Sequence, residues 1–344
     1  LDGEQLLAGL HDRLGPSHAF STTQIETYGR CPFRFFAQRL LGIKSLQDPE
    51  ADESALERGN LIHRILYSFY SANGDAVEDP ENLAQASLEL RRLGREKAAE
   101  MKLEGFFWDR ELERLLGTED NQDREGILPR FLQLQAEAAN PATATHFELS
   151  FGNYPGMGPS DAQSTSTPFV LLDTQHGDEV RLFGKVDRID RTADGHFIVL
   201  DYKTGLEPRI GEIEQGLNLQ LPLYILAIEA LFKEIGLKEG SGGAYLLLRD
   251  LEHCGRRGLF ADATQRNSAY STNRKEGLYE HHAFRQLLDT VRDFVLNYAR
   301  NIRRGIFHVT RHKPASICPG CPYAQSCRLN PQRMRTMDRI EALP

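Results

Sequence analysis

The chain has 344 residues, of which 40% are hydrophobic and 26% are charged, and its formal net charge is −8. This composition is normal for a soluble globular protein that can bury a core. No apolar run approaches the roughly 20 residues that span a bilayer, and no signal-like segment opens the chain, so we expect a cytoplasmic protein. The first residue is Leu1 rather than methionine, which suggests a processed product or an excised part of a longer protein.

The acidic total does not favour nucleic acid as a partner, because proteins that bind it usually carry basic patches. A local cationic groove can nevertheless coexist with an acidic total. Two clusters of basic residues could form such a groove, and the alternative for either is a solvated helix face. Their members are Arg30, Arg34, Arg39, Arg300, Arg303, Arg304, Arg311 and Lys313.

Helical patterns dominate the first 140 residues. Ser21 and Gln24 form a capping box that predicts a helix through Leu40, and Pro32 should kink or interrupt it. An acidic linker follows at residues 48–53.

An apolar stripe over residues 55–70 then predicts a second helix. Residues 81–140 are helix-rich and charged, and we expect a helical insertion there rather than part of the core. Glycines and a proline should break it at Gly94, Gly105, Gly117 and Pro129.

The pattern then changes to strands. Alternation over residues 145–151 places Phe147, Leu149 and Phe151 on one face and Glu148 on the other. Further strands are predicted over residues 169–172, 180–190 and 196–204, with a hairpin turn at Asp194-Gly195 before the last.

The remaining elements are mostly helical. A helix is expected over residues 213–235, a strand over 244–249, and a long amphipathic helix over 279–304. Residues 261–277 are predicted to form a polar loop. The whole order predicts a mixed α/β core with helical additions.

The most informative segment covers residues 198–205 and reads IVLDYKTG. Strand side chains alternate, so Asp201 and Lys203 project from one face. An antiparallel hairpin would bring Asp187 of the preceding strand close to Asp201. Two carboxylates can bind hard divalent cations, and a lysine can orient or deprotonate a water, which suits phosphodiester hydrolysis. For Asp-x-Lys alone, a surface ion pair is the alternative.

Four motifs resemble, in the same order, those of the PD-(D/E)XK nuclease superfamily in its RecB-like branch. One motif alone is weak, but four in order are specific, and the resemblance covers most of the chain from Ser21 to Cys327. It implies a mixed central sheet flanked by helices. The motifs are GNLIH at residues 59–63, GKVDRID at 184–190, DYKTG at 201–205 and QLPLY at 220–224.

The resemblance also assigns roles. It implies that His63, Asp187, Asp201 and the carbonyl of Tyr202 hold Mg²⁺ or Mn²⁺, and that Lys203 is the catalytic lysine.

Gln220 and Tyr224 lie one helical turn apart, where they would contact DNA or position the site. Glu148 could reach the site or remain a solvated glutamate. A buried core histidine is the alternative for His63, and ordinary core packing is the alternative for Tyr224.

The sequence has 5 cysteines, and four of them form a pattern. Clustered cysteines in a cytosolic chain indicate metal before disulfide, and four thiolates suit either zinc or an iron–sulfur cluster. The resemblance, to AddB-type and CRISPR-associated nucleases, implies a [4Fe–4S] cluster that staples the two ends of the chain. Cys254 fits no ligand spacing. The four are Cys31, Cys318, Cys321 and Cys327.

We therefore expect a single nuclease domain over residues 1–344. Its parts would be N-terminal helices at residues 21–70, the helical insertion at 81–140, the catalytic core at 145–250, and the C-terminal helix with its cysteines at 279–327.

The resemblance implies the nuclease domain of an AddB-like subunit, which trims unwound DNA ends beside an AddA-type helicase–nuclease during double-strand-break processing for recombination. The alternatives are a stand-alone RecB-like or CRISPR-associated single-strand exonuclease, a catalytically silent iron–sulfur module that binds DNA, and a zinc-bound interaction protein.

Overall fold

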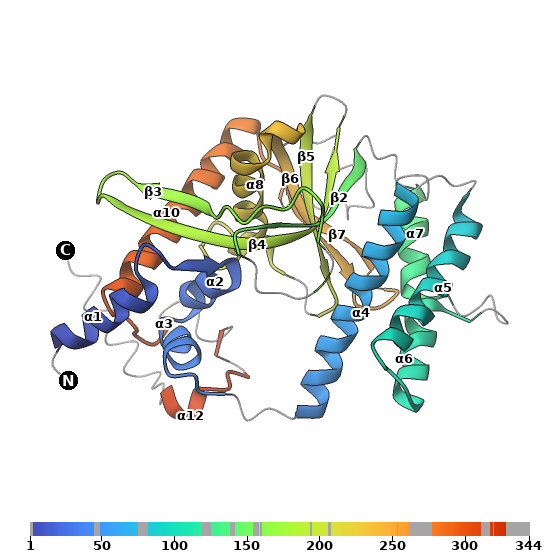
Figure 1. Cartoon of the computed structure of the whole chain (residues 1–344), viewed down its shortest axis with the longest axis horizontal. Coiled ribbons are helices and arrows are strands. Elements are labelled where there is room, and N and C mark those ends of the chain that lie inside the picture. Colours follow the sequence, from blue (N-terminus) through green and yellow to red (C-terminus); the bar gives the residue numbers. More distant parts are fainter. Residues whose placement is uncertain are drawn as a thin grey trace.

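The computed structural model shows one central sheet with helices on both sides (Figure 1). Among the described residues, no helix has the length and apolarity that a membrane crossing requires. The structure describes residues 3–44, 49–74, 82–118, 125–137, 142–153, 158, 160–192, 195–205, 208–252, 254–261, 277–310, 317–318 and 320–327.

The sheet has seven strands in the order β1-β4-β5-β6-β7, and β2 and β3 also pair with β4. Two pairs, β1 with β4 and β5 with β6, are parallel, and the others are antiparallel. This mixed sheet confirms the predicted fold class. The strands are β1 (Ala19–Ser21), β2 (Thr143–Phe151), β3 (Phe169–Asp173), β4 (Asp178–Arg191), β5 (His196–Lys203), β6 (Glu239–Leu248) and β7 (Cys254–Phe260).

The two faces of β5 bury different side chains, as strand alternation predicts. Phe197 and Val199 lie in one hydrophobic cluster, and Ile198, Leu200 and Tyr202 lie in the other. Because β5 is covered on both faces, its apolar run is nearly continuous. The carboxylate and the ammonium of the DYK sequence stand at the end of this buried strand.

One face of the sheet is covered by α2 (Thr22–Arg30), α8 (Gln220–Leu231) and α10 (His281–Arg303). The Ser21–Gln24 capping box is present at the start of α2. The helix stops at Cys31, whose backbone is extended, and the chain continues as α3 (Pro32–Phe35) and a π-helix, η1 (Phe36–Leu40). This break confirms the interruption predicted at Pro32. A new helix starts there because proline is favoured in a first helical turn.

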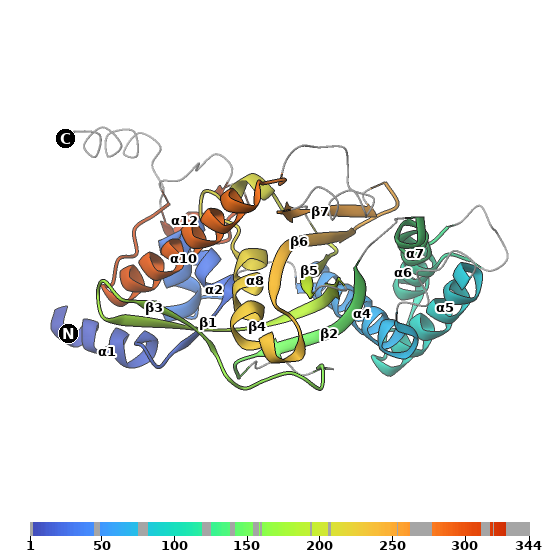
Figure 2. The same ribbon diagram turned by 90° about the horizontal axis from the view of Figure 1, so that it is seen from above.

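The other face is covered by α4 (Pro49–Asn73), α5 (Leu83–Glu100), α6 (Phe106–Leu116) and α7 (Ile127–Glu137). Their apolar residues form one cluster with β5 and β6. The helix-rich segment after residue 81 thus packs on the sheet through this cluster. Figure 2 shows α4 between the sheet and α5–α7.

Several predicted boundaries were wrong. Residues 49–53 belong to α4 rather than to a linker, in keeping with Pro49 at the first helical position and acidic residues near a helix start. Gly94 does not break α5; a Cβ there would lie 2.6 Å from Leu116, so its absence lets α6 pack closely.

The helix predicted from residue 213 begins only at Gln220. Before it, Gly216 has a φ of +72°, which ends any regular helix. β1, β7 and α1 (Gly3–Leu14) were not predicted. Asp194 and residues 262–276 of the polar loop lie outside the described residues.

The alternation predicted for β2 was also wrong. Phe147 packs in the cluster with α4, whereas Leu149 and Phe151 lie in the opposite cluster. Glu148, between them, has a φ of +56°, and the strand has a bulge between Ala144 and His146. These irregularities rotate neighbouring side chains out of the period of two.

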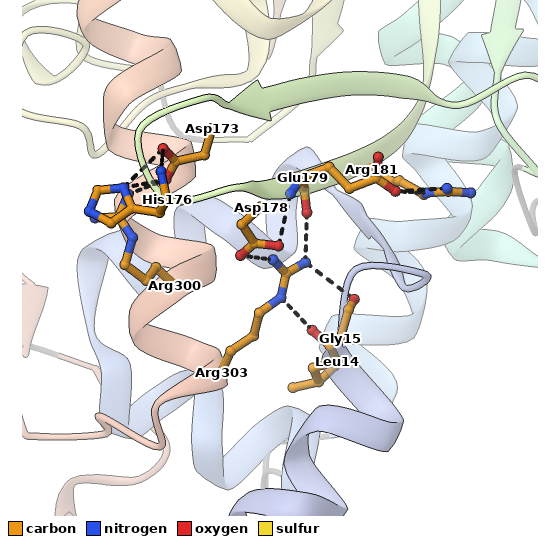
Figure 3. A network of polar contacts seen from close by, with 9 residues as sticks. All are labelled: Leu14, Gly15, Asp173, His176, Asp178, Glu179, Arg181, Arg300 and Arg303. Atoms are coloured by element: carbon orange, nitrogen blue, oxygen red, sulfur yellow. Dashed lines mark hydrogen bonds and ion pairs between the residues drawn. The ribbon is translucent and has the colours of Figure 1, made fainter.

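A polar network ties α10 to the hairpin of β3 and β4 (Figure 3). Arg303 pairs with Asp178 and donates to the carbonyl oxygens of Leu14, Gly15 and Glu179. The same side chain thus satisfies carbonyls at the end of α1, which the helix itself leaves free. Arg300 pairs with Asp173 nearby.

Candidate active site

A cleft opens beside the middle of β4 and the end of β5. Its walls come from α4 on one side and from the start of α2, η1 and α8 on the other. Two glycines of the motifs, Gly59 and Gly184, lie along it. A Cβ on Gly184 would lie 2.8 Å from the ring of Tyr224 and 2.9 Å from that of Phe151. Gly184 therefore lets α8 approach β4.

Three potential ligand groups meet at one wall of the cleft. The ligand atoms of His63, Glu148 and Asp187 all lie within 4.8 Å of one another. His63 Nδ1 is 3.3 Å from Asp187 Oδ1 and 3.6 Å from Glu148 Oε1. Glu148 and Asp187 lie on the paired strands β2 and β4, and both are buried. Glu148 thus reaches the site, the first of the two alternatives left open by the sequence.

A second group lies next to the first. Lys203 Nζ is 2.6 Å from Asp201 Oδ2 and donates to Gln220 Oε1 at 2.9 Å. The Gln220 amide donates to Asp201 Oδ1 at 2.7 Å and to the Tyr224 hydroxyl at 3.3 Å. The residues predicted from the DYKTG and QLPLY motifs are therefore in direct contact.

Asp187 connects the two groups. Its Oδ2 accepts a hydrogen bond from the backbone N–H of Tyr202 at 2.7 Å. The register pairs Arg188 with Leu200, which leaves Asp187 beside Asp201. The hairpin brings these carboxylates together, as predicted.

The electrostatics of the site follow from burial and charge. Burial alone would lower the pKa of His63, but Asp187 and Glu148 raise it well above its ordinary value. Burial and the charge of Asp187 raise the pKa of Asp201 to about 6, against the opposing effect of Lys203. Burial acts against the charged form of Lys203, yet Asp201 and Asp187 raise its pKa. Buried carboxylates and cationic side chains thus stabilise one another's charge in this site.

Two residues of α2 support the site and were missed in the sequence. Glu26 Oε1 accepts from the backbone N–H groups of Leu219 at 2.6 Å and Gln220 at 2.9 Å, so it caps α8. Thr22 lines the cleft beside Tyr224, and it opposes the rise that burial causes in the pKa of that phenol. The only sequence signal was their i, i+4 spacing on α2, because the cap joins residues far apart in the chain.

The arginines of the two predicted basic clusters have different surroundings in the structure. Arg39 lines the cleft, but Arg30 pairs with Glu212 at 2.7 Å. Arg300 and Arg303 belong to the network of Figure 3, so they are not part of a basic groove. Arg311 and Lys313 lie outside the described residues.

Contacts between the two ends of the chain surround the cysteines. The Tyr28 hydroxyl donates to the carbonyl of Ile306, and the Tyr323 hydroxyl donates to that of Ile43. In Figure 1, α12 (Ala324–Cys327) lies beside α3.

Three other cysteines influence the thiol of Cys318. Burial and then the neighbouring thiols of Cys31, Cys321 and Cys327 raise the pKa of Cys318. Among the described residues, no three cysteine sulfurs are as closely gathered as the atoms around His63. Cys254 lies apart on β7, and burial raises the pKa of its thiol to about 12.

The fold and this site define a nuclease of the PD-(D/E)XK type. A model of the PD-(D/E)XK nuclease superfamily matches residues 19–328, and the chain belongs to that superfamily.

Among curated proteins, the chain is similar to B-type subunits of ATP-dependent helicase/deoxyribonucleases from three bacteria. The identity is 27% over 240 residues with that of Clostridium botulinum, covering 67% of this chain and 19% of the relative. It is 28% over 232 residues with that of Clostridioides difficile, covering 62% and 18%. With that of Streptococcus uberis it is 26% over 318 residues, covering 85% and 26%. The chain thus spans about a fifth to a quarter of these relatives.

Proposed function

We propose that this chain is a metal-dependent deoxyribonuclease that hydrolyses phosphodiester bonds at the cleft beside β4 and β5. The observation that carries the proposal is the convergence of His63, Glu148 and Asp187 within 4.8 Å, directly beside the Asp201–Lys203 pair. Superfamily membership supplies the reaction class.

The donor set fits Mg²⁺ or Mn²⁺. Carboxylates suit both ions, and an imidazole ligand favours Mn²⁺ over Mg²⁺. His63, Asp187, Asp201 and the Tyr202 carbonyl would hold the ion, and Glu148 joins this set because of its position. When bound, such an ion neutralises charge on the phosphate and makes a water more acidic.

The protein groups around the ion have separate tasks. Lys203 orients the attacking water or stabilises charge on the reacting phosphate. Asp201 and Gln220 hold its ammonium in place. Tyr224 fixes Gln220 through its hydroxyl. This chain of contacts keeps a long, flexible lysine side chain in one position, which is what preorganised catalysis requires.

Cys31, Cys318, Cys321 and Cys327 would hold a [4Fe–4S] cluster. Their electrostatic interaction supports this assignment. A cluster spreads its ligands over several irons, so the sulfurs need not meet as closely as the ligands of one ion. The cluster would join Cys31, at the start of α3, to the C-terminal segment, and its role would be structural.

The relatives' names suggest the wider context. We infer that this chain is the nuclease domain of an AddB-like subunit, with an AddA-type helicase–nuclease as partner. Its substrate would be single-stranded or unwound DNA ends, cut exonucleolytically during double-strand-break processing for homologous recombination. A match over 85% of this chain supports the inference. A catalytically silent module is disfavoured, because the ligand groups and Lys203 are all present and in contact.

The experiment compares linear and closed circular single-stranded DNA in Mg²⁺, Mn²⁺ or EDTA. An exonuclease degrades the linear DNA, spares the circle and stops in EDTA. Asp187→Asn should abolish cleavage, whereas Asp12→Asn on exposed α1 should not. Cleavage that survives EDTA or Asp187→Asn would refute the proposed site, and cleavage of the circle would refute exonucleolytic action.

A further inference from the structure

The walls of the cleft carry two arginines in addition to the catalytic groups. Arg64 follows His63 on α4, and Arg39 lies on η1; both line the cleft. Figure 1 shows α4 and the α2–α3 segment on opposite sides of the region below β4. The two cations therefore belong to facing walls.

These arginines differ from the other cations of the cleft. Lys203 is paired with Asp201, and Lys185 is paired with Glu148. Arg39 and Arg64 are exposed and make no ion pair with any other described residue. A solvated arginine without a carboxylate partner is stable in water, and its guanidinium group is available to bind an anion such as a phosphate.

The cationic side chains on the floor of the cleft are already engaged by its carboxylates. Glu148, Asp187 and Asp201 are all buried there. These pairs leave little positive charge free to attract a polyanion, and the whole chain, with a net charge of −8, repels one. Cations at the rim offset this repulsion locally.

We propose that Arg39 and Arg64 bind backbone phosphates of the substrate strand on the two sides of the reacting phosphate. The inference rests on the proposed function. Guanidinium groups match phosphate oxygens bidentately. Beside Arg64 on α4, Asn60 and Leu56 also line the cleft, and Leu56 is 67% exposed. These residues supply a polar and an apolar contact for sugars, and the strand is held independently of its sequence.

The test measures binding of a fluorescent single-stranded oligonucleotide by anisotropy in EDTA, at several salt concentrations. Each variant, Arg39→Ala and Arg64→Ala, should weaken binding about three- to tenfold, and each should flatten the salt slope by about 0.7. Arg39→Glu and Arg64→Glu should weaken it further. Arg13→Ala, an exposed arginine on α1 away from the cleft, is the matched control.

The outcomes separate this inference from the proposed function. Unchanged affinity and salt slope in both variants overturn the phosphate-binding role, even if the parent cleaves DNA. Absence of binding by the parent overturns it as well. If the variants bind DNA more weakly but the parent shows no metal-dependent cleavage, the phosphate-binding role is supported. The proposed nuclease activity is then refuted.

Discussion

The pKa values of two neighbouring aspartates in the cleft, Asp187 and Asp201, are shifted in opposite directions. Burial raises the pKa of both, but His63 and the N–H of Tyr202 more than offset this for Asp187, whose pKa is lowered. The pKa of Asp201 is instead raised by burial and by the charge of Asp187, although Lys203 opposes the rise. An aspartate that is kept charged in this way is suited to hold a cation.

Asp173, in the network of Figure 3, gives a pH-dependent prediction. A hydrogen bond from His176, and then Arg300, lower its pKa to about 2, although burial opposes them. Because the folded pKa lies below the unfolded value of about 3.9, its stabilising contribution is full above that value and is lost as pH falls towards 2. Urea unfolding should show a larger gap between the parent and Asp173→Asn at pH 5 than at pH 3. A gap that is constant or grows at pH 3 would contradict this assignment.

Residue patterns predicted which side chains of the cleft lie together better than they predicted backbone detail. Alternation alone placed Asp201 and Lys203 on one face, because β5 is regular. The same reasoning failed on β2, since a positive φ at Glu148 breaks the period of two. No local signal in the sequence marks that backbone conformation.

At the scale of elements, the contact between α2 and α8 holds Gln220 in place beside Lys203. Glu26 caps α8 at the residue that holds Lys203. Glu26→Ala should cost about 0.5–2 kcal/mol of stability, as for other lost caps. It should also lower kcat about tenfold or more with KM little changed, since Gln220 loses its anchor.

Two further variants test whether Glu26 acts by positioning Gln220. Glu26→Gln keeps the acceptor oxygen and should restore most of kcat. Arg303→Ala should lose similar stability in the distant network of Figure 3 while kcat is kept. Equal losses of kcat in Glu26→Ala and Arg303→Ala would assign the effect to stability alone.

Element boundaries were predicted where local chemistry sets them and missed where tertiary contacts do. The capping box at Ser21 and the long stripe of α10 are local signals. β1 is three residues long and is held by its parallel pairing with β4. β6 begins with a glycine-rich stretch of low strand propensity, and a Cβ on Gly240 would lie 2.4 Å from Ile225 of α8. The packed helix thus explains Gly240, whereas Gly242 is crowded by Phe260 of β7.

At the scale of the whole molecule, the segment that follows Cys31 contacts the segment that carries Cys321 and Cys327, through the hydrogen bond from Tyr323 to Ile43. If these residues hold the proposed cluster, Cys31→Ser should remove iron and its visible absorbance. It should also lower Tm by about 5 °C or more, because the proposed link would close a very long loop. Cys254→Ser, away from the cluster, should keep both. Metal analysis measures the iron content of each variant, and thermal unfolding measures its Tm. Zinc instead of iron in the parent, or iron retained by Cys31→Ser, would contradict the assignment.

The central claim is that this cleft is a nuclease centre that depends on Lys203. The most direct measurement is the single-turnover cleavage rate of end-labelled single-stranded DNA by the parent, Lys203→Ala and the exposed control Lys233→Ala. Loss of a group that stabilises the reacting phosphate should cost about 10²–10³-fold in rate or more, whereas the control should match the parent. Cleavage by Lys203→Ala at the parental rate would contradict this account.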